Sequence, residues 1–410
     1  MNPKEEGMEM AASNRNQGRL RIAIFSDSAL PVLNGVSISI DSLITELRNR
    51  GHSVHLFTAR HPKVSEIEPH TYRFRAIETP WTKDYPLAFP PFYRMLRKFR
   101  RHEFDVIHTH TPFTLGFVGL RWAESHGIPI VATYHTLYDR YVHYIPFIPR
   151  RYLRFKLAKH TNFYYNKVSH VITPSEASLK WLRRHSVTTP VTVIPTAALP
   201  KQFFDRSEIR LKLGIPSDHK ILLYVGRLAK EKNMSTLLEM AAIAFQSDPS
   251  LRLWLVGDGP YRTECVRMTR ELGIGDRVKF VGFIPRAEVD RYYAAADLFV
   301  FASITETQGL VVQEAMNYGL PAVAVTGGGA SEGIVEGENG FIVRNDAAAF
   351  AEEVLHVLGQ ENLHARLSDG AVKSVRRQGT DAMCDRVVEV YRQAIHPNSA
   401  DGAKPLERVK

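Results

Sequence analysis

Short apolar runs alternate with helix-like patterns through the first half of the chain. The runs predict strands at RLRIAIFSD, HSVHLFTAR, FDVIHTH, IPIVATYHT and HVITPS. Between them, SISIDSLITELRNRG, GFVGLRWAESHG and a long basic stretch before HVITPS have helical patterns, the first closed by Gly51 in the position of a C-terminal cap. Each predicted strand is apolar nearly throughout, which is typical of a parallel sheet that is buried on both faces.

The same alternation restarts after residue 200. It runs through KILLYVGR, LRLWLVGDGP, RVKFVGF and DLFVFAS, with helices between them, and continues through EAMNYGLPAVAVTGGG and GENGFIV. The proline-punctuated segment VIPTAALPKQFFDRSEI between the halves is typical of a linker. The predicted fold class is α/β, with two Rossmann-like domains that face each other across a cleft.

The length of the chain agrees with two domains, because 410 residues exceed the usual size of one hydrophobic core. The predicted parts are a flexible tail over residues 1–18, a first domain over 19–198, a second over 199–379 and a flexible tail over 397–410. Ligands of such sheets bind outside the carboxyl ends of the strands, so the site is expected at those junctions.

Composition adds charge and compartment to this picture. A hydrophobic content of 44% is that of a globular protein, and a net charge of +10 favours anionic partners such as phosphorylated small molecules, nucleic acid or an acidic lipid surface. The two cysteines, Cys265 and Cys384, provide no disulfide framework and suggest a reducing cytosol. The polar start is not a signal peptide, and no apolar run approaches the roughly 20 residues of a spanning helix, so contact with a membrane would be peripheral.

Two cations follow the first strand of the second half. KILLYVGR ends in Arg227, and the loop LAKEKN carries Lys230 and Lys232. At such a strand end, arginine can bind a diphosphate through two parallel N–H groups, and lysine can bind it as a compact positive charge. The alternative is a solvated basic loop, and the position at the carboxyl end of a strand is what raises Arg227 and Lys232 as candidates.

The segment ETQGLVVQE sets Glu306 and Glu314 eight residues apart. A helix is predicted to begin near Gln308 or Gly309, so Glu306 precedes it and Glu314 lies inside it. On a continuous helix the two side chains would be about 80° apart, so they need not form an acid/base pair. Instead, the helix N-terminus would offer an anion site, with a hydroxyl-binding carboxylate on either side, which suits a nucleotide sugar. A capping glutamate followed by an exposed one is the alternative.

In the first half, the strand ends carry glycine and histidine. Gly35, after the first strand, permits close approach of the backbone to a ligand or simply makes a turn. His108 and His110 could bind a metal, but a lone H-x-H pair is more often structural, and no metal site is assigned. His135 ends IPIVATYHT and is expected to line the cleft, with Tyr138, Asp139 and His143 behind it.

Two glycine-bearing turns give weaker signals. LVGDGPYR fails the dinucleotide fingerprint, because Arg262 stands where the third glycine belongs, so a tight strand-exit turn is preferred. TGGGA, at 326–330, could cradle phosphate or form a loose turn.

The stretches 91–102 and 148–167 mix basic and aromatic residues at near-helical spacing. Such a face can lie in an anionic lipid interface, and Arg150, Arg151, Arg154 and Lys156 are the candidate residues of the second stretch. Nucleic acid is the competing partner, and a solvated basic face is the plain alternative.

Together these segments resemble the retaining GT-B glycosyltransferases of family 4 over nearly the whole chain. ETQGLVVQEAMNYGLPAVA is similar to the E-x7-E motif of that family, and VGRLAKEKN to its phosphate-binding segment. Within the family, HTHTPFTLGFVGL and TYHTLYDRYVHYIP are most similar to the membrane-associated diacylglycerol glucosyltransferases. The departures are VIPTAALP, where Ala197, Ala198 and Leu199 replace a polar turn and no ligand role is assigned, and TGGGASEG.

The resemblance implies a role for each matching residue. Arg227 and Lys232 would neutralise the diphosphate, Glu306 would accept from sugar hydroxyls, and Glu314 would hold the ribose. The resemblance also implies that Gly35, Gly309, Leu310 and Val311 lie beside sugar and phosphate, that His135 lines the reacting centre, and that Gly282, Phe283 and Ile284 border the base. The helix over about 380–396 would cross back onto the first domain.

The resemblance further implies retention by front-face attack, without a required metal; Mg2+ is at most stimulatory. The favoured prediction is transfer of glucose from UDP-glucose to diacylglycerol by a cytoplasmic enzyme that associates peripherally with the inner face of the plasma membrane, with no nucleic-acid partner. The alternatives are a GDP-mannose-dependent mannosyltransferase that acts on a lipid or soluble acceptor and, in a different class, a nucleotide-sugar 2-epimerase. A non-catalytic nucleotide-sugar-binding protein is the least favoured.

Overall fold

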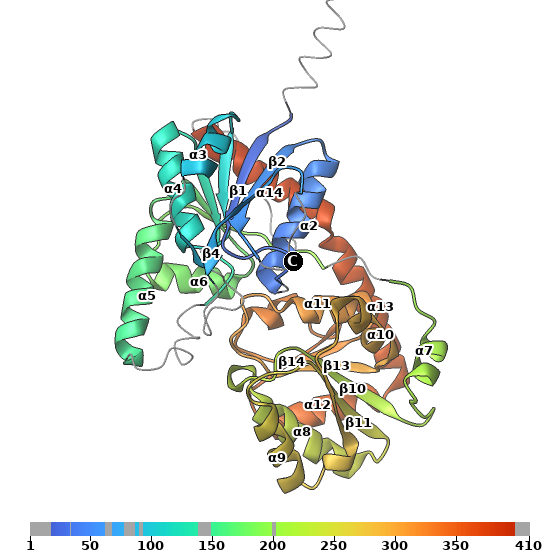
Figure 1. The fold of residues 1–410 in the computed structure, drawn as a ribbon. Helices are drawn as coiled ribbons and strands as arrows, with labels where there is room; N and C mark the ends of the chain where they lie inside the picture. The colour runs from blue at the N-terminus through green and yellow to red at the C-terminus, as the bar shows by residue number, and fades with distance from the viewer. Residues whose placement is uncertain are drawn as a thin grey trace, which may run out of the picture.

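A computed structural model describes residues 18–32, 34–61, 68–77, 87–89, 93–137, 149–198 and 202–397 of the chain. It contains two parallel sheets, one in each half, and helices cover both faces of each sheet (Figure 1). The predicted α/β class with two Rossmann-like domains is confirmed. The predicted tails lie outside the described residues, except for Gly18 and Pro397 at their inner ends.

The sheet of the first domain has the strand order β3-β2-β1-β6-β7-β8-β9. Its strands are β1 (Arg21–Ser26), β2 (Ser53–Ala59), β3 (Thr71–Phe74), β6 (Val106–Thr109), β7 (Ile130–Thr133), β8 (His170–Thr173) and β9 (Val191–Val193). A separate antiparallel pair consists of β4 (Ala76–Ile77) and β5 (Leu87–Ala88). The helices of this domain are α2 (Gly35–Asn49), α3 (Tyr93–Arg100), α4 (Thr114–His126), α5 (Arg150–Tyr165) and α6 (Glu176–Arg184).

The sheet of the second domain has the order β12-β11-β10-β13-β14-β15. Its strands are β10 (Lys220–Val225), β11 (Leu251–Val256), β12 (Val278–Gly282), β13 (Leu298–Phe301), β14 (Ala322–Val325) and β15 (Gly340–Val343). Its helices are α7 (Arg206–Lys212), α8 (Met234–Ser247), α9 (Arg262–Glu271), α10 (Arg286–Ala295), α11 (Leu310–Asn317), α12 (Ala347–Leu358), α13 (Glu361–Arg377) and α14 (Thr380–Ile395). Short 3-10 turns are η2 (Lys230–Lys232), η3 (Gly275–Arg277) and η4 (Gly329–Gly333). In the part of the chain that the structure describes, no helix is long and apolar enough to cross a membrane.

The predicted linker is shorter than the sequence suggests. Its first residue, Val193, belongs to β9, and its last four residues belong to α7. Asp205 caps α7, because its side chain accepts a hydrogen bond of 2.8 Å from the backbone N–H of Glu208. The segment DRSE carries the signal of a helix start, but the prolines before it make the whole stretch look like a linker. Gly51 has a φ of +83° just past α2, as its predicted place after the helix requires.

Chain order reverses once in each sheet, and this fixes where a ligand can sit. The reversal falls between β1 and β6 in the first sheet and between β10 and β13 in the second. At such a point the loops leaving the two strands separate and open a crevice at their carboxyl ends. The loops after β1, β6 and β7 therefore border one side of the cleft, and those after β10 and β13 border the other.

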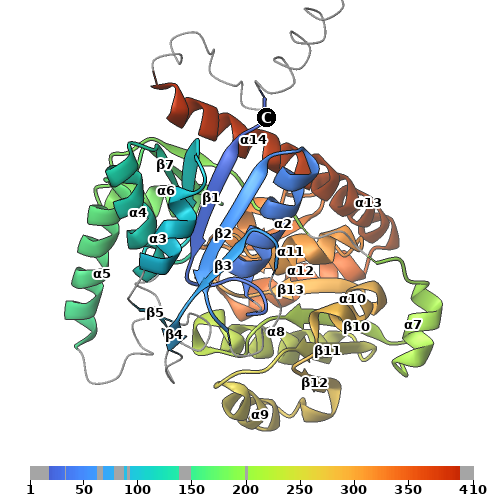
Figure 2. The same cartoon turned by 45° about the horizontal axis from the view of Figure 1, so that its top comes forward.

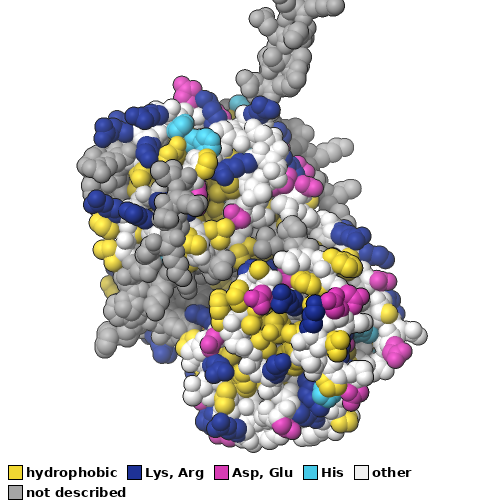
Figure 3. Space-filling model, turned by 45° about the vertical axis from the view of Figure 1, so that its right-hand side comes forward, with side chains coloured by type: hydrophobic (Ala, Val, Ile, Leu, Met, Phe, Trp, Pro, Cys, Tyr) yellow, Lys and Arg dark blue, Asp and Glu magenta, His cyan; other side chains and the backbone are white. Residues whose placement is uncertain are grey.

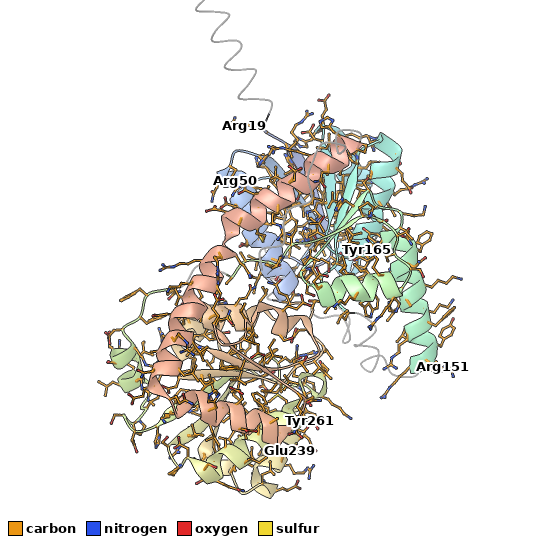
Figure 4. The ribbon with its side chains drawn as sticks, turned by 180° about the vertical axis from the view of Figure 1, so that it is seen from behind. Arg19, Arg50, Arg151, Tyr165, Glu239 and Tyr261 are labelled. Atoms are coloured by element: carbon orange, nitrogen blue, oxygen red, sulfur yellow. The ribbon has the colours of Figure 1, made fainter. Side chains whose placement is uncertain are left out.

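The last helix, α14, belongs to the second half by sequence but packs on the first domain. Met383, Val387 and Tyr391 are buried in one cluster with Ile22 and Ile40. Figures 1 and 2 both show α14 running along α2 beside the first sheet. Arg50, at the end of α2, donates to the carbonyl oxygen of Asp381 at 2.8 Å and pairs with Asp385, and Figure 4 shows Arg50 beside this helix. The helix thus covers one face of a sheet whose strands all precede it by about 190 residues or more in the sequence.

Candidate functional site

Lys232 and Glu306 meet at the carboxyl ends of β10 and β13. Lys232 is the last residue of η2, and its Nζ donates to Oε1 of Glu306 in the loop before α11. Their side chains are only 13% and 19% exposed, so this ion pair is shielded from bulk water. Arg227 lies on the same loop with a more exposed side chain, and its guanidinium contacts Oε1 of Glu231 at 2.6 Å. The structure thus places two cations, each paired with its own carboxylate, at the crevice of the second sheet.

Helix α11 begins beside this pair. Gly309, its N-cap, has a φ of +72°, and an added Cβ would stand 2.6 Å from Cβ of Ala330, so glycine is required here. Across the cleft, α2 begins at Gly35, where an added Cβ would lie 3.8 Å from Cδ1 of Leu310. Two helix N-termini therefore approach each other. Asn34 caps α2 by accepting from the N–H of Ser37, and the positive dipole ends of the two helices favour an anion between the domains.

Glu314 is buried on α11 and separated from Glu306 by its partners. Its Oε1 lies 3.3 Å from a guanidinium nitrogen of Arg286, and its Oε2 accepts from the hydroxyl of Tyr293 at 2.9 Å. Burial raises the pKa of Glu314, although the nearby Arg286 opposes this shift. Oε2 accepts one hydrogen bond and Oε1 faces the guanidinium of Arg286, and each oxygen can accept a further bond, so Glu314 can still bind a hydroxyl. The two glutamates are held by different groups and do not form an acid/base pair.

His135 ends a row of histidines on the first domain. Its Nε2 lies 2.9 Å from Nδ1 of His110, and His108 in turn contacts the hydroxyls of Thr133 and Tyr391 at 2.7 Å each. Burial lowers the pKa of His135 to about 4 and that of His108 to about 3, so both rings are neutral at physiological pH. The row can accept or donate hydrogen bonds at the cleft but carries no charge.

Contacts between the domains hold these parts together. The hydroxyl of Thr307 donates to the carbonyl oxygen of His135 at 2.7 Å. The side chain of Gln308 accepts from the backbone N–H of Thr196 at 2.9 Å and donates to its carbonyl at 2.7 Å. The carboxylate of Glu332 accepts from the first two N–H groups of α6 at 2.7 and 2.6 Å, which caps a helix of the other domain. These hydrogen bonds therefore hold the loop that carries Thr307 and Gln308 against the first domain, next to the histidine row.

Known families match the two halves in turn. Glycosyltransferase Family 4 matches residues 33–198, and Glycosyl transferases group 1 matches residues 205–374. An α-monoglucosyldiacylglycerol synthase of Acholeplasma laidlawii is 30% identical over 393 residues, which cover 93% of this chain and 98% of that protein. One of Streptococcus pneumoniae is 35% identical over 315 residues, covering 74% and 71%. The chain belongs to the family 4 glycosyltransferases.

Other relatives of this family 4 enzyme share its fold with different named activities. A GDP-mannose-dependent α-mannosyltransferase of Mycobacterium tuberculosis is 29% identical, covering 91% of this chain and 96% of that protein. Sucrose-phosphate synthase of Thermosynechococcus elongatus superposes with a TM-score of 0.73 at 27% identity, covering 92% and 99%. HepE of Anabaena, bound to UDP-glucose, gives 0.72 at 22%, covering 92% and 100%, and so shares the fold. The enzyme is a retaining GT-B glycosyltransferase.

The predicted donor residues of the glycosyltransferase lie together around α11. Lys232 contacts Glu306, which precedes the start of α11 at Gly309, Leu310 and Val311. Gly35 of α2 approaches Leu310 from the other domain. Of the three residues predicted to border the base, Gly282 ends β12 with a φ of +85°, and Phe283 and Ile284 follow the strand; Phe283 is 71% exposed. The roles of these residues in donor binding stay predictions.

The glycine turns of the enzyme are packed rather than open. An added Cβ at Gly257 would lie 2.1 Å from the carbonyl oxygen of Gly226, so LVGDGP is the predicted tight strand-exit turn. In TGGGA, an added Cβ at Gly329 would come 1.9 Å from the carbonyl oxygen of Thr307. The second turn therefore braces the loop that carries Glu306 instead of forming a loose turn.

The acceptor-side predictions divide into two groups. Tyr138, Asp139 and His143 fall within 138–148, outside the described residues. Arg150, Arg151, Arg154 and Lys156 are exposed on the first two turns of α5. Figure 4 shows Arg151 at the outer end of this helix, pointing away from both domains, whereas Tyr165 lies at the inner end.

Sequence reasoning missed several groups that shape the site. Arg286 and Tyr293 hold Glu314, Gln308 joins the domains, and Glu332 caps α6. Asp27, directly after β1, accepts from the hydroxyl of Thr111 at 2.6 Å, and burial raises its pKa to about 6. Among these residues, only Asp27 could have been recognised as a site candidate from the sequence, because it is a carboxylate at the end of a buried strand. In the described part of the chain, no group of three or more His, Cys, Asp or Glu side chains is placed to hold a metal ion.

Proposed function

We propose that the enzyme transfers glucose from UDP-glucose to the free hydroxyl of diacylglycerol at an anionic membrane surface on the cytoplasmic side. The observation that carries this proposal is the exposed face of α5 on the domain opposite the donor edge. Tyr152, Phe155 and Phe163 are 54%, 62% and 51% exposed there. Large exposed aromatic side chains on one helix are costly in water and suit a lipid interface.

The charge of α5 supports the same partner. The helix contains basic side chains and no acidic one, whereas the face of the second domain in Figure 3 mixes acidic and basic side chains. Lys156 lies 5.4 Å from the ring centre of Tyr152, and Lys167, just after the helix, lies 5.2 Å from that of Phe163. Basic residues interleaved with aromatic ones bind anionic headgroups while the rings enter the interface.

The similarity to two α-monoglucosyldiacylglycerol synthases supports both the sugar and the acceptor. GDP-mannose is the second candidate donor, because a GDP-mannose-dependent mannosyltransferase is also similar to this chain, at 29% identity. On either donor the proposed chemistry is the same: the acceptor oxygen attacks the anomeric carbon on the face that the diphosphate leaves. The acceptor proton passes to the departing phosphate oxygen, and no covalent intermediate forms because the acceptor itself bonds to the anomeric carbon.

In this proposal the chain itself stabilises the leaving group. Lys232 and Arg227 neutralise the diphosphate, the N-termini of α2 and α11 add N–H donors, and Glu306 orients the sugar through its hydroxyls. Binding of the donor would draw Lys232 toward phosphate, which leaves Glu306 free to accept from the sugar. Mg2+ is assigned no step and is expected to stimulate at most.

The test is a matrix of labelled UDP- and GDP-sugars against diacylglycerol and soluble acceptors, followed by lipid extraction. The expected product is a lipid-extractable glucosyl-diacylglycerol that carries the label from UDP-glucose. A mannolipid formed from GDP-mannose would favour the second donor. A changed nucleotide sugar formed without any acceptor would show an epimerase and refute transfer to lipid.

The proposed membrane contact of α5 can be tested separately from the transfer reaction. Replacing Arg150, Arg151 and Arg154 together with alanine should weaken binding to phosphatidylglycerol vesicles by about 100-fold at low salt, since each basic residue near such a surface contributes about 1 kcal/mol. Co-sedimentation measures this loss. The matched control replaces Arg262, Arg267 and Arg270 of α9, which changes the charge equally on the second domain. Equal binding by both triple variants would contradict a membrane-facing α5.

A further inference from the structure

An apolar hollow opens between the start of α4 and the outer part of α5. Its volume is about 540 Å3, which lies in the range of about 300–1,000 Å3 of small-molecule sites. Four of its lining residues are apolar and come from both helices or their approaches: Phe113, Leu153, Leu157 and Phe163. His160 completes the lining together with the exposed Lys156 and Lys159.

The hollow adjoins the cleft through the loop after β6. Phe113 follows His110 by three residues, and His110 contacts His135. His160 donates from Nε2 to the carbonyl oxygen of Pro112 at 2.7 Å, and its ring lies 6.1 Å from that of Phe113 in a stacked arrangement. One short loop thus lines the hollow with Phe113 and also carries His110, which contacts His135 at the cleft.

The lining defines what could occupy the hollow. A wall of leucine and phenylalanine offers nothing to the hydroxyls of a soluble sugar acceptor, because those groups would lose their hydrogen bonds to water there. It suits a hydrocarbon chain. The two lysines beside it, on a helix that carries no acidic residue, match anionic headgroups at the mouth. Diacylglycerol would supply the hydrocarbon chain, and the anionic lipids around it would supply the headgroups.

We propose that this hollow seats one hydrocarbon chain of the acceptor lipid while its hydroxyl is presented to the cleft near His135. The inference rests on the proposed function, because only a lipid acceptor brings such a chain. It adds a consequence that lipid transfer alone does not require: the enzyme distinguishes acceptors by the length of their chains.

The experiment fills the hollow and measures that distinction. Leu157→Trp should raise the KM for dipalmitoylglycerol about tenfold, the loss that displacing about two methylene groups gives. The KM for the short-chain dihexanoylglycerol, the affinity for UDP and the binding to phosphatidylglycerol vesicles should stay unchanged. Leu211→Trp, on an 80% exposed position of α7, is the matched control. If the tryptophan variant fails to fold, Leu157→Ala, which adds no volume, replaces it. This variant should change the preference between long-chain and short-chain acceptors and leave the affinity for UDP and the vesicle binding unchanged.

Each other outcome overturns the proposal in its own way. An unchanged KM for the long-chain acceptor in both variants, with glycolipid still formed, removes the chain site and leaves the proposed function standing. Equal losses for both chain lengths assign the hollow to general membrane contact. A change in mass by light scattering with unchanged preference assigns it to a second copy of the chain. If the unaltered enzyme forms no glycolipid from either diacylglycerol, the proposed function itself fails.

Discussion

Replacing Lys232 with alanine is expected to lower glycosyl transfer by about 100- to 1,000-fold, the range observed when one group that stabilises developing charge is removed. The leaving diphosphate gains negative charge as the glycosidic bond breaks, and Lys232 is the more shielded of the two cations at this edge. Its removal also leaves Glu306, with a side chain only 19% exposed, without its partner. The carboxylate would then repel the phosphates. Steady-state kinetics with the preferred donor gives the size of the loss.

Lys230 provides the matched control for this experiment. It occupies the same 3-10 turn and carries the same charge, but it is exposed and lies at the other end of the turn. Lys230→Ala should retain most of the activity, and vesicle binding should be unchanged in both variants. Equal losses in the two variants would mean that the loop acts only through its net charge, as a solvated basic loop would.

Glu314→Gln is expected to raise the KM for the donor by about 10- to 100-fold with a smaller change in kcat, because a buried charged acceptor for hydroxyl groups contributes about 1.5–3 kcal/mol. The amide keeps the shape and can still accept from Tyr293, but it loses the charge that faces Arg286. Burial raises the pKa of Glu314. Donor binding by the unaltered enzyme should therefore weaken on acidification at a higher pH than for an exposed glutamate, and the glutamine variant should lack this component.

Asp290→Asn separates donor binding from stability. Asp290 pairs with the same guanidinium of Arg286 at 2.6 Å but lies on α10 rather than on α11. Both variants should lower the melting temperature by removing a partner of a partly buried arginine. Only Glu314→Gln should change the KM for the donor substantially. Parallel changes in both variants would assign Glu314 a structural role.

Much of the fold could be predicted because each strand and helix carries its own pattern. KILLYVGR and DLFVFAS are apolar over short runs, and β10 and β13 fall within them. The start of α11 was also predictable, because Gly309 combines freedom in φ with a position after a strand-exit loop. The angle expected between Glu306 and Glu314 assumed one continuous helix. Glu306 instead precedes the left-handed Gly309, so its direction is set by its bond to Lys232.

The partners of the site residues could not be predicted from spacing. Arg286 and Tyr293 reach Glu314 from α10, and nothing in their local sequence distinguishes them from other charged and aromatic residues of that helix. Glu332 caps a helix that begins 156 residues earlier in the chain. Such contacts depend on how two sheets and two domains meet, which no local pattern encodes.

The position of α14 has a consequence for how the protein is made. The first sheet is complete in sequence at β9, yet one of its faces is covered by Val387, Val388 and other residues of α14. At about 5–20 residues per second, a ribosome takes roughly 10–40 s to pass from the end of β9 to the end of α14. Throughout that time Ile22, Ile24 and their neighbours lack their final cover. The domain synthesised first is thus the last to acquire its complete core.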